Sequence, residues 1–77
     1  MHVLTLNKVR SPHLLETKGR YDLLLNGNKV STVYYNMRGY LIDNGIPLPG
    51  GGKFQLPECS LTTIKREIAA INREARA

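Results

Sequence analysis

The stretch from Arg20 to Tyr35 constrains the fold more than any other part of the chain, because its side chains alternate in character on both sides of Asn26-Gly27-Asn28. A period of two is typical of a strand with one buried face. Asn and Gly adopt the positive φ angles that tight turns between antiparallel strands require. The sequence therefore predicts a β-hairpin over these residues.

Two registers of the predicted hairpin differ in the residues that form the turn. A turn at Gly27-Asn28 gives three cross-strand pairs, namely Leu25 with Val30, Leu23 with Thr32 and Tyr21 with Tyr34. A turn at Asn26-Gly27 places Leu25 opposite Asn28 instead. We favour the first register because it matches the apolar faces of the two strands better.

Three further segments have the composition of strands. Val3 to Val9 precedes Ser11-Pro12, where proline removes a backbone donor and ends the run. The other two are Tyr40 to Ile42, which the turn signal Asp43-Asn44-Gly45 closes, and Lys53 to Leu56. We expect strands at these segments, and the signal is weaker at Lys53 to Leu56 than at the other two.

Two stretches lack the periodicity of a helix or a strand. His13 to Lys18 fits a loop, although Leu14 and Leu15 also suit a short helical turn. Ile46 to Gly52 holds two prolines and three glycines, so we expect an irregular and partly mobile connection there.

The residues after Pro57 predict an amphipathic helix from Ser60, a favourable N-cap, to Ala77. Apolar residues recur at spacings of three and four, which places them on one stripe: Leu61, Ile64, Ile68, Ile71 and Ala75. At about 100° per residue, four basic side chains fall within an arc of about 100° on one flank of that stripe: Lys65, Arg66, Arg73 and Arg76. Glu67 and Glu74 lie together on the opposite flank, so charge is segregated along this helix.

These elements predict an α+β fold: a three- to four-stranded, mainly antiparallel sheet with one C-terminal amphipathic helix packed on one face. A chain of 77 residues has room for one domain, residues 1–77, and for a small core. We therefore expect marginal stability unless a partner or a dimer interface adds burial, which leaves a homodimer open.

The residues that carry catalytic or metal chemistry are sparse. Cys59 is the only cysteine, so an internal disulfide and a four-ligand zinc site are excluded, and His2 and His13 show no ligand spacing. Gly50-Gly51-Gly52-Lys53 resembles a phosphate-binding loop in its glycines, but Phe54 stands where such a loop needs Ser or Thr. We therefore expect no enzyme activity, no cofactor and no metal.

The charge balance favours an anionic partner, because eleven Lys and Arg residues against six Asp and Glu give a formal net charge of +5. One candidate surface is an exposed sheet face that carries Tyr35 and is flanked by Arg20, Lys29 and Arg38. We expect Tyr35 rather than Tyr34 to be exposed, since Tyr34 shares its face with Val30 in the favoured register. The second candidate surface is the helix flank with Lys65, Arg66, Arg73 and Arg76. Both surfaces also suit a solvated face that binds nothing.

Three segments together resemble small accessory proteins carried by phages and prophages. They are Tyr34-Tyr35-Asn36-Met37-Arg38-Gly39-Tyr40, Ile46-Pro47-Leu48-Pro49 and the helix from Ser60 to Ala77. The resemblance implies a protein that binds a host macromolecule, as anti-CRISPR proteins do. It also implies the cytoplasm of a bacterial host as the location.

The interpretation that joins these observations is a small non-enzymatic binding protein. We expect a phage-type inhibitor or modulator that binds a host protein or protein complex. The alternative is a basic, regulatory nucleic-acid-binding domain. The sequence from Met1 to Arg10 lacks the apolar run of a signal peptide or membrane span, so we expect no membrane partner and an intracellular protein.

Overall fold

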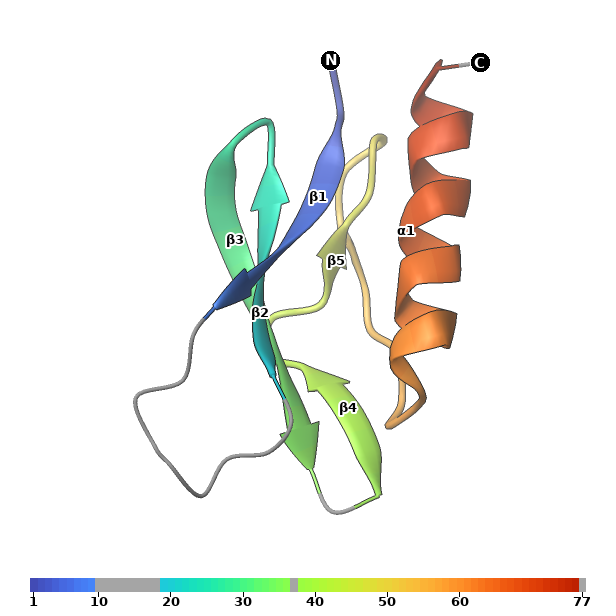
Figure 1. The fold of residues 1–77 in the computed structure, drawn as a ribbon. Helices are drawn as coiled ribbons and strands as arrows, with labels where there is room; N and C mark the ends of the chain where they lie inside the picture. Colours follow the sequence, from blue (N-terminus) through green and yellow to red (C-terminus); the bar gives the residue numbers. More distant parts are fainter. Residues whose placement is uncertain (10–18, 37, 77) are drawn as a thin grey trace.

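A computed structural model describes residues 1–9, 19–36 and 38–76. Four antiparallel strands form the main sheet in the order β1-β2-β3-β4, with bounds Leu4–Val9, Arg20–Leu25, Asn28–Asn36 and Gly39–Ile42. A second, two-stranded sheet pairs β5, Ile46–Pro47, with β6, Lys53–Phe54. The helix α1, Leu61–Arg76, lies over one face of the main sheet (Figure 1). The α+β class and the antiparallel four-stranded sheet are confirmed, while His13 and the loop predicted at 13–18 lie outside the described residues.

The hairpin forms where the sequence predicts it, but the register that we favoured is wrong. The turn is Asn26-Gly27, with φ angles of 52° and 88°, and Leu25 pairs with Asn28. Both central residues of this turn need positive φ, which Asn and Gly adopt at low cost. The turn therefore follows backbone conformation, whereas our prediction followed the apolar pairing of the strands.

A β-bulge then restores the apolar face. Leu24 pairs with Lys29 but Leu23 pairs with Ser31, so Val30 is an extra residue on β3. Between these two pairs β3 advances by two residues while β2 advances by one. The bulge therefore moves the later side chains of β3 to the opposite face of the sheet. Beyond it, Val33 lies opposite Tyr21 on the face that α1 covers.

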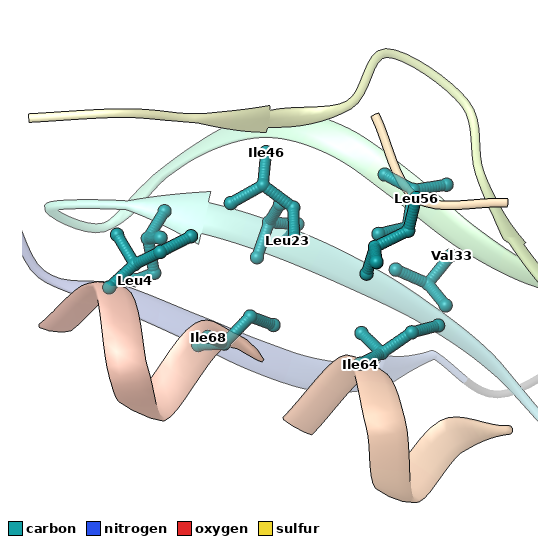
Figure 2. Packing of buried hydrophobic residues seen from close by; sticks show 9 residues of the cluster. Leu4, Leu23, Val33, Ile46, Leu56, Ile64 and Ile68 are labelled. Carbon is teal, nitrogen blue, oxygen red and sulfur yellow. The ribbon is translucent and has the colours of Figure 1, made fainter. Parts of the chain in front are cut away.

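The core lies between that face and the segments that cover it (Figure 2). The main sheet contributes Leu4, Leu23, Val33 and Ile42. The helix contributes three buried isoleucines, Ile64, Ile68 and Ile71. Ile46 and Leu56, from the segment between β4 and α1, fill the remaining side. Helix and sheet are thus held by one continuous apolar cluster, whose burial is the main stabilising term.

The segment from Ile46 to Gly52 differs from its predicted form, because it begins with a strand. Ile46 is fully buried and pairs with Phe54, while Pro47 pairs with Lys53. The Leu48 N–H donates to the Gly52 carbonyl and the Gly51 N–H to that of Leu48, both at 3.1 Å, which closes the turn. The predicted strand Lys53 to Leu56 is shortened to β6 and belongs to this second sheet. Burial of Ile46 outweighs the strand-breaking tendency of its neighbours.

The start of α1 agrees with the sequence. The Ser60 hydroxyl accepts a hydrogen bond from the Thr63 N–H at 3.2 Å, which is the geometry of an N-cap. The predicted apolar stripe faces the sheet. Its orientation fixes which side chains of the helix face solvent.

Candidate functional site

The helix presents four cations on one side, which we call the basic flank: Lys65, Arg66, Arg73 and Arg76. All four are exposed, and none of them forms an ion pair with another described residue. Glu67 and Glu74 lie on the opposite flank, too far around the helix to neutralise them. The structure therefore brings together the second surface predicted from the sequence.

The rotation of α1 that exposes this flank is fixed by Asn72, which lies between the apolar stripe and the basic flank. The Leu4 N–H donates to Asn72 Oδ1, and Asn72 Nδ2 donates to the Leu4 carbonyl, both at 2.9 Å. The side-chain amide thus occupies the place of a neighbouring strand. The basic flank consequently begins beside β1, which runs opposite in direction to α1 (Figure 1).

The outer edge of β1 is the second element of the site. The Asn26 N–H donates to the Val3 carbonyl at 2.9 Å, so the N–H and C=O of Leu4 point away from β2. The register with β2 is regular, and the same groups of Leu6 and Lys8 therefore point outward as well. Asn72 forms hydrogen bonds with the outward N–H and C=O of Leu4. No described residue forms a hydrogen bond with the outward groups of Leu6 and Lys8.

The opposite edge of the sheet, at β4, is covered. The Tyr40 N–H donates to the Cys59 carbonyl at 2.7 Å, and the Cys59 N–H donates to the Tyr40 carbonyl at 3.2 Å. Gln55 Nε2 donates to the Ile42 carbonyl at 3.0 Å. Gly39 allows this approach, because a Cβ there would lie 2.8 Å from the Cys59 carbonyl oxygen. With β4 and Leu4 covered, the second half of β1 is the part of the sheet edge that no described residue covers, and we call it the open edge.

The other predicted surface, around Tyr35, does not form on one face. Tyr35 lies on the helix side of the sheet, opposite Tyr40, whereas the register places Arg20 and Lys29 on the other side. Arg38 lies in the turn between β3 and β4, and Lys29 forms an ion pair with Asp22 at 3.3 Å. The grouping is wrong because the bulge moves Lys29 and Tyr35 to opposite faces.

Tyr35 is nevertheless exposed, at 41%, as predicted. The reason differs from ours, because Tyr35 shares its face with the buried Val33. Its ring packs edge-on against Tyr40 with centroids 5.3 Å apart, and Tyr40 contacts Tyr21 at 6.3 Å. These rings extend the core rather than offer an isolated stacking platform.

Two titratable groups beside the β4 edge have shifted pKa values. Burial raises the pKa of the Tyr40 hydroxyl, and Tyr21 and Tyr35 raise it further. Burial also raises the pKa of the Cys59 thiol, with a smaller contribution from Glu67. A raised pKa disfavours the thiolate, so Cys59 is a poor nucleophile at neutral pH.

A shallow hollow of about 130 Å³ lies at the end of α1, lined by His2, Val3, Asn72 and Arg76. His2 Nε2 is 2.9 Å from the Pro47 carbonyl oxygen and links the first residues to β5. Among the described residues, no three His, Cys, Asp or Glu side chains are grouped closely enough to hold a metal ion. Over residues 1–9, 19–36 and 38–76, no helix combines the length and the apolar character that crossing a bilayer requires.

No protein-family model matches this chain, and no curated protein or solved structure is significantly similar to it. The likeness to phage accessory proteins therefore stays a prediction. Sequence reasoning found the basic flank but missed Asn72 and the edge of β1. The position of Asn72 beside the apolar stripe was the available signal, because a polar residue there meets whatever the helix packs against.

Proposed function

We propose that this chain is a small non-enzymatic binding protein, a phage-type inhibitor or modulator, that binds an acidic surface of a host protein or protein complex. The observation that supports the proposal most is the basic flank. It holds four exposed cations that no described residue neutralises, on a helix whose rotation the core and Asn72 fix. A partner surface with complementary charge would meet it without rearrangement.

Binding through this flank suits inhibition rather than catalysis. Long Lys and Arg side chains combine an apolar stem with a charged end, so they cover a partner surface and pair with its carboxylates. Charges of one sign on one flank also steer the partner into a single orientation. A small protein that occupies an acidic groove in this way blocks it without a chemical step.

Nucleic acid is the second candidate partner, and the net charge of +5 favours it. The same four side chains would contact phosphates, which carry no sequence information themselves. The two partners differ in their response to salt, because phosphate contacts release counterions and binding weakens steeply as salt rises.

The test is a pull-down from bacterial lysate with the tagged protein, with and without nuclease and at low and high salt, followed by reconstitution with the purified partner. Arg66→Glu with Arg73→Glu reverses the flank. Arg38→Glu with Lys53→Glu is the matched control, because it changes the net charge equally with exposed residues outside α1 that form no ion pair with another described residue.

We expect one stoichiometric protein complex that survives nuclease, is lost in the flank variant and persists in the control variant. Loss of every partner on nuclease treatment would make nucleic acid the ligand. Equal binding by the flank variant and the unaltered protein would contradict the proposal for either partner.

A further inference from the structure

The open edge of β1 offers a second kind of contact beside the basic flank. The N–H and C=O of Leu6 and Lys8 point away from β2, and these backbone groups can form a ladder with another extended chain. Three positions on the two edge strands show how this fold covers its edges: Leu4 of β1 with Asn72, and Tyr40 and Ile42 of β4 with Cys59 and Gln55. The second half of β1 has no such cover among the described residues.

The positive charge around this edge indicates which kind of strand could bind there. Lys8, one of the two open positions, is exposed, and the basic flank begins beside Asn72 on the adjoining helix. A second copy of β1 would place the two Lys8 side chains opposite or diagonal to each other, between chains that each carry a net charge of +5. Like charges across a strand pair are destabilising, and edge lysines oppose such self-pairing. A strand with carboxylates reverses that effect.

We propose that the edge of β1 at Leu6 and Lys8 is a strand-addition site for an extended, acidic segment of the partner protein. This inference rests on the proposed function and specifies the form of the partner at the same site. The added strand hydrogen-bonds to the outward groups of Leu6 and Lys8, and its acidic side chains pair with Lys8 and with the near end of the basic flank.

The first experiment uses a short capped peptide that alternates glutamate and valine, added to ¹⁵N-labelled protein. Amide exchange should slow at Leu6 and Lys8 when the peptide binds. Thr5 and Asn7 are internal controls, because their amides already face β2 and should change little. Unchanged exchange at Leu6 and Lys8, with the peptide bound elsewhere, would overturn the inference.

Two control peptides separate backbone pairing from charge. A version with N-methylated backbone nitrogens has the same charge but cannot donate to the edge, and we expect it to bind at least about tenfold more weakly. A peptide that alternates lysine and valine should not bind. Equal binding of the methylated and unmethylated peptides would show that charge alone holds the ligand, which contradicts strand addition.

The matching protein variant is Lys8→Pro, compared with Lys8→Gln. Proline removes an outward N–H without removing a bond between β1 and β2, and edge positions of this kind accept it. Lys8→Gln removes the charge and keeps the donor. Binding of the acidic peptide should fall about tenfold in Lys8→Gln and further in Lys8→Pro.

The same variants, tested against the purified partner, distinguish this inference from the proposed function. If the Arg66→Glu, Arg73→Glu variant loses the partner and Lys8→Pro retains it fully, the basic flank binds and the edge does not. If neither variant affects binding, the proposed function fails with the inference. Sedimentation of the unaltered protein gives the remaining outcome, because a dimer that protects Leu6 and Lys8 without peptide would assign the edge to a second copy.

Discussion

At the scale of single residues, Asn72 and Gly39 decide how the two edges of the sheet are covered. Asn72 bonds both backbone groups of Leu4, and Gly39 lets the chain around Cys59 approach β4. Neither role follows from local sequence, because each partner lies far away along the chain. Both are therefore sites where a small substitution should have a large effect.

Asn72→Ala should lower the free energy of unfolding by about 1–3 kcal/mol, because two hydrogen bonds to the partly buried Leu4 backbone are lost. Urea denaturation measures the change, and Glu74→Ala on the exposed side of the same helix is the control. Amide exchange at Leu4 should also accelerate. An Asn72→Ala protein as stable as the control would show that water replaces the amide at no cost.

Gly39→Ala should destabilise the fold by about 1–3 kcal/mol, because the added Cβ would lie 2.8 Å from the Cys59 carbonyl oxygen. Gly50→Ala is the matched control, since a Cβ at that position meets no atom within 4 Å. Thermal unfolding of the two variants checks the difference. Equal melting temperatures would mean that the chain around Cys59 yields without cost.

At the scale of elements, the regular ones could be predicted and the irregular ones could not. The hairpin and α1 follow from alternation and from the spacing of the isoleucines, which are local properties. The bulge at Val30 escapes such reasoning because it depends on the choice of turn together with the need to bury Val33. The basic flank was predictable with the helix, whereas the open edge of β1 depends on strand order and on a bond between residues 68 positions apart.

The sequence did not predict β5, because the prolines and glycines of residues 46–52 are typical of an irregular loop. Ile46→Ala tests the contribution of β5 to the core. The substitution should cost about 2–5 kcal/mol, because Ile46 is fully buried and its loss leaves a cavity. Phe54→Ala, at the paired position on β6, should cost much less because Phe54 is 37% exposed. Chemical denaturation of both variants makes the comparison, and equal losses would contradict a core role for β5.

At the scale of the whole molecule, stability should fall at alkaline pH. The folded state raises the pKa of both Cys59 and Tyr40, so the neutral forms are favoured by folding. That stabilisation is complete below the pKa values of the unfolded chain and is lost as pH rises through the folded ones. Denaturation midpoints should therefore decline from about pH 8.5 upward.

Cys59→Ala and Tyr40→Phe identify the groups responsible for the alkaline decline, because each removes one titration while keeping most of the packing. Either variant should reduce the dependence of the midpoint on pH above about 8.5, and the double variant should reduce it further. A decline as steep in the double variant as in the unaltered protein would assign it to other groups.

The bond between Asn72 and Leu4 also sets an order of events during translation. β1 leaves the ribosome long before α1, because Asn72 follows Leu4 by 68 positions. Until the helix is complete, Leu4 lacks its bonds to Asn72, so no described residue covers the outward edge from Leu4 to Lys8, and during that interval any neighbouring nascent strand is a competitor. The edge of the folded protein is thus what remains of a longer one, and α1, which is translated after β1, decides how much of it other chains can use.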